Sequence, residues 1–423
     1  MLESFTIKNF KSYADATLKL SPLTVLVGAN ASGKSNALEA IRFLSWLAQG
    51  QKLSSLQYKI NQDEQVVRGH IRDLFRHNEL GFTLGFTYEL GLNLSISFDF
   101  RLDELHITHE SAYVGSKYIY HTIKPTDGIA TDITVEYQDF FQEGKNTIIC
   151  TDQQAIFTQL GNAARFADAH TEAQKKIPSF SKALESYLAN ILFLDPLPNK
   201  MRDYSFLSDK KLRGDGSNLS AVLYHLWNDI KNQKNILSFI QSLPEQNIKT
   251  IDFLKGPRGE VMLQLVETFG NTERKIDASL LSDGTLRVLA IASALLSAPE
   301  ENMVIIEEID NGVHPNRAKK LLESINNIAH AKSLKILISS HNPALLDALP
   351  IEAIPHAVFC YRDKKDGFSK LVRLEDVPDY PELIAQGSLG DLVTQGVLDK
   401  FVKNFEGRDV KKKKALEWLE AVQ

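Results

Sequence analysis

The first fifty residues contain segments with strand-like and helix-like spacing of apolar side chains. Apolar and polar positions alternate along Ser4–Phe10, which predicts a strand, whereas Leu23–Val27 is apolar throughout, as expected for a strand buried on both faces. Gly28–Lys34 is a glycine-containing loop, and Ser35–Leu47 carries apolar residues at helical spacing. The pattern therefore predicts a buried strand, a loop and a helix in direct succession.

The middle of the chain is patterned differently. Leu80–Val114 alternates in stretches separated by turn residues, which predicts an antiparallel meander continued by Thr131–Tyr137 and Asn146–Cys150. Thr151–Leu192 is polar with a helical pattern. Further elements are predicted as a helix at Ser217–Ile230 and strands at Ile248–Phe253 and Val261–Thr268.

The last third alternates helices with short buried strands, which is typical of an α/β fold. Helices are predicted at Leu286–Leu296, Pro315–His330 and Pro343–Leu349, and strands at Met303–Ile306, Lys335–Ser339 and His356–Tyr361. We expect residues 1–50 and 250–370 to form one discontinuous head and residues 51–249 to form an insertion, with the meander first and a helical region after it. Residues 371–423 are predicted to be a tail with an amphipathic helix.

Composition narrows the class of protein. The chain has 423 residues, of which 43% are hydrophobic and 24% charged, with a net charge of -5, so it is neither disordered nor strongly basic. The longest apolar stretch, Val288–Ala298, is too short to span a membrane. Two cysteines, Cys150 and Cys360, cannot form a disulfide framework. We expect a cytoplasmic protein without a membrane partner.

The loop after the second predicted strand carries a phosphate-binding motif. Gly28-Ala29-Asn30-Ala31-Ser32-Gly33-Lys34-Ser35 fits G-x-x-x-x-G-K-[ST] between a strand and a helix. The glycines let the backbone wrap phosphates, Lys34 would reach the β- and γ-phosphates, and the Ser35 hydroxyl would bind Mg²⁺. The alternative is a glycine-containing turn with a surface lysine.

Two acids follow the predicted strand Met303–Ile306. In open α/β sheets, ligands bind at the carboxyl ends of the strands, where Glu307 and Glu308 are placed. Glu307 would support Mg²⁺ through a water, and Glu308 would polarise the attacking water. The alternative is a strand that ends in solvent at an acidic turn.

Two further segments are weaker candidates by themselves. Ser282 and Gly284 lie at a predicted helix N-terminus, which is a natural anion site but is equally explained by N-capping. His341 follows the strand Ile336–Ser339 and could contact a γ-phosphate, although such a histidine is commonly a structural turn residue.

Taken in order, these segments resemble the ABC-type ATPase clade, and within it the RecF/SMC-like and OLD-like branch. Ile7–Tyr13 looks like the first strand of that branch. Gly28–Ser35 followed by Asn36 is similar to its Walker A motif, and Leu281–Thr285 to its signature. The further matches are Glu307-Glu308 to the Walker B acid and catalytic glutamate, Asn311–Pro315 to the D-loop region, and His341 to the switch histidine.

The resemblance implies a fold and a mechanism. The fold would be an α/β P-loop head with a mixed sheet, an antiparallel meander and an inserted helical region. ATP would lie between two heads of a homodimer or higher oligomer, where Ser282 and Gly284 of one copy face the γ-phosphate held by Lys34 of the other. His341 would sense the γ-phosphate, and Lys11 would approach the nucleotide. ATP binding would close the dimer and hydrolysis would open it.

The chain departs from the family pattern at several positions. Glu307 stands where aspartate is usual, Ile309 where proline is common, and Asp283 and Thr285 replace the commoner glycine and glutamine of the signature. Gln62 and Gln65 are the candidates for the Q-loop residue. The segment between Lys34 and Ser282 has no heptad run, so no long coiled coil is expected, and no D-x-D follows His341, so no Toprim nuclease is expected.

Three functions remain open at this stage. The leading interpretation is an ATPase whose head dimer acts on DNA or controls a separate effector, such as a nuclease or toxin, plausibly in anti-phage defence. The second is a RecF-like ATPase of DNA repair or recombination. The third is a regulatory scaffold that binds nucleotide to hold an assembly together, with little turnover.

Overall fold

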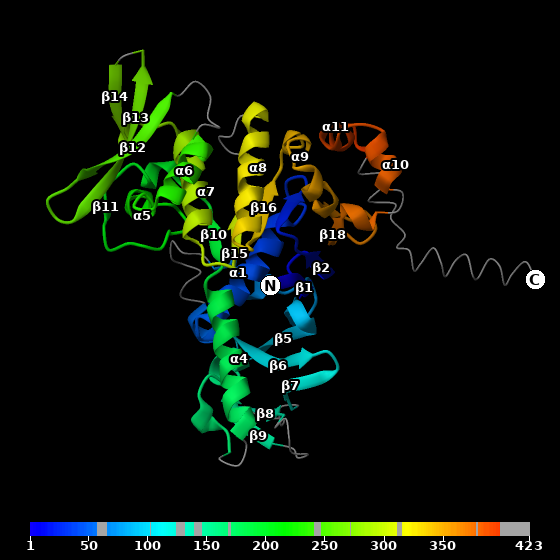
Figure 1. The fold of residues 1–423 in the computed structure, drawn as a ribbon. Helices are drawn as coiled ribbons and strands as arrows, with labels where there is room; N and C mark the ends of the chain where they lie inside the picture. Colours follow the sequence, from blue (N-terminus) through cyan, green and yellow to red (C-terminus); the bar gives the residue numbers. More distant parts are fainter. Residues whose placement is uncertain are drawn as a thin grey trace, which may run out of the picture.

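The computed structural model describes most of the chain as two large sheets with helices around them (Figure 1). The described residues are 1–56, 66–101, 103–123, 132–138, 146–167, 171–240, 247–270, 272–310, 315–377 and 380–397. Within these ranges no helix has both the length and the apolar character that a membrane crossing needs.

The first sheet is antiparallel and has eight strands in the order β2-β1-β4-β5-β6-β7-β8-β9. It confirms the predicted meander, and it also contains the first hairpin of the chain. Its aromatic core joins the sheet to helix α1, because the Phe43 ring lies 5.4 Å from Phe98, which stacks on Phe82 at 4.8 Å. The strands are β1 Leu2–Phe10, β2 Tyr13–Lys19, β4 Gly81–Tyr88, β5 Leu92–Arg101, β6 Glu104–Val114, β7 Lys117–Thr122, β8 Asp132–Tyr137 and β9 Asn146–Thr151.

The second sheet has six strands in the order β10-β15-β16-β3-β17-β18, and all but β18 run parallel. Its inner strands are short and mostly apolar, as expected where both faces of a sheet are covered, and every residue of β3 is buried. The sheet therefore separates two hydrophobic cores: Met303 and Ile305 of β15 face one, Val304 and Ile306 the other. The strands are β3 Leu23–Val27, β10 Leu192–Leu194, β15 Met303–Ile306, β16 Lys335–Ser340, β17 Val358–Arg362 and β18 Ser369–Arg373.

Helices cover both faces of the parallel sheet. Helix α1 (Lys34–Ala48) lies in the core shared with the antiparallel sheet and packs on α4 (Thr171–Ala189). On the other face lie α7 (Asp283–Ser297), α8 (Pro315–Ala331) and α9 (Ala344–Asp347). The remaining α-helices are α3 Ile156–Gln159, α5 Leu219–Leu226, α6 Ile230–Ile240, α10 Tyr380–Ala385 and α11 Leu389–Thr394.

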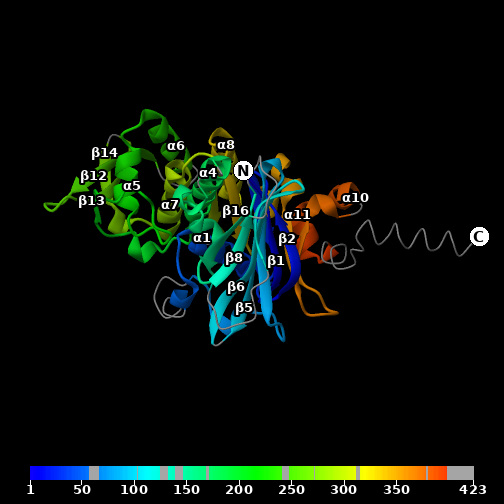
Figure 2. The same cartoon turned by 90° about the horizontal axis from the view of Figure 1, so that it is seen from below.

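A small sheet completes the fold. Its strand β13 pairs with β11, β12 and β14, and it packs on α5. The two views show this sheet with α5 and α6 on one side of the molecule and α10 and α11 on the opposite side (Figures 1 and 2). The strands are β11 Ser205–Phe206, β12 Ile248–Lys255, β13 Glu260–Phe269 and β14 Thr272–Asp277.

The structure refines several of the predicted elements. Thr151–Leu192 was predicted to be helical throughout, but α3 and α4 are separate helices, with β10 beginning at Leu192. A hairpin turn at Asp363–Asp366 joins β17 to β18. The additional strands, which were not predicted, are β2, β7, β10, β11, β14 and β18. Asn311–His314, Gln62 and Gln65, and the tail residues 398–423 lie outside the described residues.

The sheets also run across the predicted domain boundaries. Strand β1 pairs with β4, so the first hairpin and the meander share hydrogen bonds, and β10 pairs with β15, so the insertion contributes a strand to the head sheet. The division into residues 1–50 with 250–370, 51–249 and 371–423 stays a prediction, because strand pairings do not by themselves delimit domains.

Candidate nucleotide-binding site

The loop between β3 and α1 has a backbone shape that only small residues permit. Ala31 and Gly33 have positive φ angles of 62° and 116°. A Cβ atom at Gly28 would lie 2.2 Å from the Cys360 carbonyl oxygen, and one at Gly33 would lie 2.3 Å from Ser369 Oγ. A left-handed conformation at such positions turns successive amides toward one concavity, which suits an anion.

Helix α1 leaves its N-terminal amides available. Its N-cap Gly33 makes no side-chain cap, and its first turn contains no acidic residue. The first amides of a helix have no partner within the helix and carry the positive end of its dipole. Ser35 lies in this first turn, and Asn30 is exposed in the loop before it. The loop and the helix start together present donors to a phosphate group.

The protein holds the loop by its carbonyl groups. The Ser369 hydroxyl, on β18, donates to the Ser32 carbonyl at 2.6 Å, and the Tyr13 hydroxyl donates to the Gly33 carbonyl at 3.1 Å. The Cys360 thiol donates to the same Ser32 carbonyl at 3.4 Å. The Ser32 and Gly33 carbonyls are therefore occupied on the protein side, while the Ser32 amide donates to the Ala29 carbonyl within the loop at 3.2 Å.

Asn36 belongs to this support. Its Nδ2 donates to Ser12 Oγ at 2.8 Å, and Ser12 Oγ lies 2.7 Å from Ser369 Oγ. The described contact of the Asn36 side chain therefore joins α1 to the turn between β1 and β2. Beneath the loop, Ser32 has a buried hydroxyl oxygen without a hydrogen-bond partner.

Lys34 folds back over the loop. Its Nζ donates to the carbonyl oxygens of Gly28 at 2.5 Å and Ala29 at 3.1 Å. Burial lowers the pKa of Lys34, while the charges of Cys360, Glu308 and Asp310 raise it. The carboxylates after β15 therefore lie within electrostatic reach of the Lys34 ammonium group.

The acidic pair follows β15 at the carboxyl edge of the parallel sheet. Arg42 NH2, from α1, lies 2.5 Å from Glu307 Oε1. Burial raises the pKa of Glu307, and the Arg42 charge opposes that rise. Glu308 is exposed with a φ of 46°, and its amide donates to Ser339 Oγ at 3.1 Å. Strand β16 lies between β15 and β3, so this acidic turn and the phosphate-binding loop share one edge.

His341 lies at the same edge, directly after β16. Its Nδ1 is 3.1 Å from Asp310 Oδ2. The Asp310 side chain is only 5% exposed, whereas His341 is 45% exposed. The loop, Glu308 and His341 thus come from the ends of three adjacent strands.

Asp195 joins this edge and was not identified from the sequence. Leu194 pairs with Ile306 in parallel register, so Asp195 and Glu307 follow neighbouring strand ends. Burial raises the pKa of Asp195 and so does Glu308, whereas Arg287 and Arg42 lower it. An apolar run followed by an acid, as in Ile191–Asp195, is the same signal that identified Glu307, and its four apolar residues match Met303–Ile306 in length.

Lys11, in the turn between β1 and β2, contacts α1, whereas the resemblance implies that it approaches the nucleotide. Its Nζ pairs with the buried Glu39 carboxylate, which also binds Arg68 Nε, and donates to the Arg68 carbonyl at 2.8 Å. Glu39 is one turn along α1 from Ser35. The described contacts of Lys11 are thus with an ion pair on α1, and a contact with nucleotide stays a prediction.

The predicted signature segment forms the start of α7. Ser282 is its N-cap, and its Oγ accepts a hydrogen bond from the Thr285 amide at 3.2 Å. Arg202 fixes this turn, donating to the Leu281 carbonyl and to Asp283 Oδ1, each at 2.5 Å. Ser282 therefore caps α7, as the N-capping explanation of this segment predicts. Ser282 is also exposed, and Gly284 is partly exposed.

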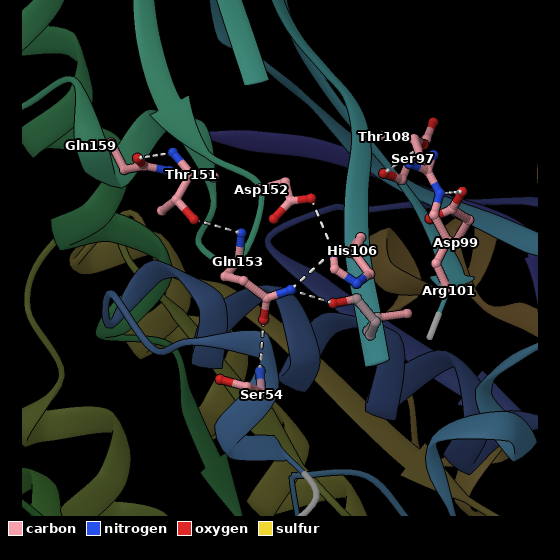
Figure 3. Close-up of polar contacts among 11 residues, drawn as sticks. Ser54, Ser97, Asp99, Arg101, His106, Thr108, Thr151, Asp152, Gln153 and Gln159 are labelled. Atoms are coloured by element: carbon pink, nitrogen blue, oxygen red, sulfur yellow. Dashed lines mark hydrogen bonds and ion pairs between the residues drawn. The ribbon is translucent and has the colours of Figure 1, made fainter. Parts of the chain in front are cut away.

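A second polar cluster lies at the start of β6, next to the short helix η1 (Leu53–Ser55) (Figure 3). His106 Nδ1 is 2.9 Å from Asp152 Oδ2. Gln153 accepts from the Ser54 amide at 3.1 Å and donates to the Leu105 carbonyl at 3.0 Å. Its contacts join β6, the end of β9 and η1, so we assign it a structural role. Across the described ranges, no three histidine, cysteine, aspartate or glutamate side chains are arranged to hold a metal ion.

Two curated proteins are similar to parts or most of this chain. A protein of Helicobacter pylori named ATP/GTP phosphatase is 20% identical over 362 residues, which cover 82% of this chain and 87% of that protein. The DNA replication and repair protein RecF of Paenarthrobacter aurescens is 50% identical over 77 residues, which cover 18% of this chain. That match spans only 17% of the RecF protein's length.

The solved structures similar to this chain include heads of SMC proteins. An SMC head bound to the C-terminal winged-helix domain of ScpA is 16% identical, with a TM-score of 0.47 and coverage of 88% of this chain and 98% of that one. The SMC head of Thermotoga maritima is 12% identical, with a TM-score of 0.40 and the same coverage of both chains.

One family model spans most of the chain, from residue 23 to residue 347, and its description is "AAA domain, putative AbiEii toxin, Type IV TA system". That span includes the phosphate-binding loop, the acidic strand end and the histidine that follows β16. The chain therefore belongs to this AAA family and is an ABC-type, RecF/SMC-like P-loop protein.

Proposed function

We propose that the chain binds ATP with Mg²⁺ at the loop Gly28–Ser35 and hydrolyses it. One observation carries the proposal. Lys34 lies at the same edge of the parallel sheet as Glu308 and Asp310, and the charges of these two carboxylates act on its ammonium group. The loop fits a phosphate because Ala31 and Gly33 are left-handed and the carbonyls of the loop are held from behind. The Ser35 hydroxyl would bind Mg²⁺ directly and the Glu307 carboxylate would support it through a water, and both offer the hard oxygen atoms that Mg²⁺ prefers.

Each side chain at this edge then has a role. The loop amides bind phosphate oxygens, and Lys34 exchanges its contact with the Gly28 carbonyl for the β- and γ-phosphates. Glu308 polarises the attacking water, while Glu307, held by Arg42, orients the metal through a water. His341 contacts the γ-phosphate. Bound Mg²⁺ would neutralise the charge that develops on the phosphates.

The proposal extends to a second copy of the chain. Ser282 and Gly284 are accessible at the start of α7, where the positive end of the helix dipole favours an anion. We infer that they face the γ-phosphate held by Lys34 of another copy, in a homodimer or a higher oligomer. ATP binding would then close the two heads, and hydrolysis would release them.

The output of this cycle is proposed to be control of a separate effector, such as a nuclease or toxin, or action on DNA. The family description refers to a toxin of a type IV toxin–antitoxin system, and that link to a toxin system is compatible with anti-phage defence. A cytoplasmic location follows from the same proposal.

One observation favours the RecF-like alternative. The 50% identity with RecF is high, but it is confined to 77 residues. A RecF-like protein should bind DNA in an ATP-dependent and salt-sensitive manner. A scaffold with little turnover, in contrast, should stay oligomeric with bound nucleotide and release little phosphate.

Phosphate release by the purified full chain with ATP and Mg²⁺ tests hydrolysis. Glu308→Gln should retain ATP binding but lower kcat by about 100-fold or more, because it removes the group that polarises water. Glu104→Gln, at an exposed strand end, is the matched control and should leave kcat unchanged. A wild type that releases no phosphate rules out hydrolysis, and a fully active Glu308→Gln variant rules out the assigned role.

The nucleotide-trapped variant also separates the possible outputs. Glu308→Gln with ATP should form the closed oligomer in size-exclusion chromatography. DNA binding by this oligomer would favour action on DNA or the RecF-like alternative over control of a separate effector. A monomer at all nucleotide concentrations contradicts the proposed head dimer.

A further inference from the structure

Asp310 is a buried carboxylate with one described partner, the His341 ring. Its side chain is 5% exposed, its Oδ2 lies 3.1 Å from His341 Nδ1, and its Oδ1 is buried without a hydrogen-bond partner. Leaving a carboxylate buried with so few partners costs stability, since an ionised group loses its hydration. Such an arrangement is commonly found where a charge serves a functional site.

The backbone holds these two residues in fixed relation. The Glu308 amide donates to Ser339 Oγ, and the Ile309 amide donates to the Ser339 carbonyl at 3.3 Å. Ser339 is two residues before His341 on the same strand end. The turn that carries Asp310 is therefore attached to the strand that carries His341, and the contact between the side chains has little freedom to vary.

The contact decides which ring nitrogen is free. An ionised carboxylate only accepts hydrogen bonds, so Nδ1 must carry the proton. Nε2 is then the ring nitrogen left for a ligand on the 45% exposed histidine. The carboxylate–histidine pair is a general device for fixing the tautomer and orientation of an imidazole.

We propose that Asp310 is a positioning residue for His341, fixing its Nδ1–H tautomer so that Nε2 meets the nucleotide. This inference rests on the proposed ATP site. To donate a hydrogen bond to a γ-phosphate oxygen, Nε2 must take up a proton from solvent, so that both ring nitrogens are protonated. The Asp310 carboxylate balances the positive charge of this ring. Because Asp310 also acts on the pKa of Lys34, it lies within electrostatic reach of both groups.

The first test needs no nucleotide and no variant of Asp310. Nitrogen-15 NMR of histidine-labelled protein at about pH 8.5, where an ordinary imidazole is neutral, reports the tautomer of each ring. The His341 signals are those lost in His341→Gln. We expect the Nδ1–H tautomer; an Nε2–H tautomer overturns the inference, whether or not the protein hydrolyses ATP.

The second test is a double-mutant cycle on ATP hydrolysis. Asp310→Ala alone should lower kcat by about 10- to 100-fold, the usual effect of losing such an outer partner, without raising the KM for ATP. In a His341→Gln background the same change should have no further effect on kcat, because Asp310 acts through the ring. Additive losses overturn the inference. Asp310→Asn, which keeps the side-chain shape, replaces Asp310→Ala in the same cycle if the alanine variant does not fold.

A matched control is available in the chain. His356 Nδ1 lies 3.4 Å from Glu375 Oε2, a second carboxylate–histidine pair, in the segment around β17 and β18. Glu375→Gln should leave kcat and the His341 signals unchanged. A wild type without hydrolysis would refute the proposed function, whereas the NMR result would still decide the role of Asp310.

Discussion

The Arg42 guanidinium lies 2.5 Å from the Glu307 carboxylate and 5.0 Å above the Phe193 ring. This contact links the helix that follows the phosphate-binding loop to the strand end that carries the acids. The ion pair is partly buried, so removing one partner leaves the other charge without compensation. Arg42 is therefore expected to hold Glu307 both ionised and oriented.

Arg42→Met should raise the Mg²⁺ concentration needed for half-maximal hydrolysis by about 10-fold, because Glu307 loses the partner that positions it. The measurement is phosphate release over a Mg²⁺ titration at saturating ATP. Arg72→Met is the control, since Arg72 pairs with Asp103 in an exposed position. If Arg42→Met hydrolyses ATP with the same Mg²⁺ dependence as the wild type, Glu307 does not depend on Arg42 to act on the metal.

Lys34→Met should weaken ATP binding by about 100-fold, equivalent to about 2.7 kcal/mol, because a charged hydrogen-bond donor to the phosphates is lost. Folding should be spared, since burial already lowers the pKa of Lys34 and the substitution removes a partly desolvated charge. Titration with a fluorescent ATP analogue measures the affinity, and thermal melting measures stability. Lys8→Met, on the exposed side of β1, is the control. Equal affinities for Lys34→Met and wild type would place the nucleotide elsewhere.

Ser282→Ala should cost about 1 kcal/mol of stability, because the N-cap of α7 is lost. Under the proposed head dimer it should also abolish ATP-induced association. Ser282→Asp separates these effects, since aspartate caps a helix well but places a negative charge where the phosphate should bind. We expect normal melting and no dimer for Ser282→Asp by size-exclusion chromatography with ATP. A dimer of wild-type strength for this variant contradicts the proposed contact.

Glu110 predicts a pH-dependent stability outside the nucleotide site. It is fully buried, accepts hydrogen bonds from Tyr120 Oη and from the Ile156 and Phe157 amides, and its pKa is raised from 4.5 to about 7, mainly by burial. Between pH 4.5 and about pH 7, the Glu110 carboxyl group is ionised in the unfolded chain but keeps its proton in the folded chain. Stability should therefore fall as the pH rises from 4.5 to 7, by about 3 kcal/mol at most.

The measurement is urea unfolding at several pH values. Glu110→Gln should remove this component of the pH dependence, and it should also lower stability at low pH by about 1–3 kcal/mol, because its amide group cannot accept from both backbone amides. Glu136→Gln, at the less buried carboxylate that binds Tyr118 Oη at 2.8 Å, is the control. An identical pH slope in wild type and Glu110→Gln would show that Glu110 is not the group that titrates.

Sequence patterns predicted the four inner strands of the parallel sheet, β3, β15, β16 and β17, because their apolar runs are short and bounded by polar or glycine residues. The two edge strands, β10 and β18, were not predicted. Leu23–Val27 and Met303–Ile306 have the predicted bounds. Strand order could not be predicted in the same way. The pairing of β1 with β4, and of β10 with β15, depends on contacts between distant segments, and local periodicity carries no information about them.

The candidate site shows the same limit. A local motif identified Lys34, and the acids after a buried strand identified Glu307 and Glu308. Arg42 occupies an ordinary helical position, and Asp310 an ordinary turn, so nothing local distinguishes them. Their roles come from partners more than thirty residues away in sequence, at Glu307 and His341.

Ser12 and Ser369 meet beneath the phosphate-binding loop, although they come from the two ends of the described chain. The support for the Ser32 carbonyl is therefore missing from any growing polypeptide that has not yet passed β18. During synthesis the loop can form early, but its backing is completed only after β18 has left the ribosome. Competence to hold nucleotide should thus arise only once β18 has been made, which would keep shorter nascent chains from engaging one another.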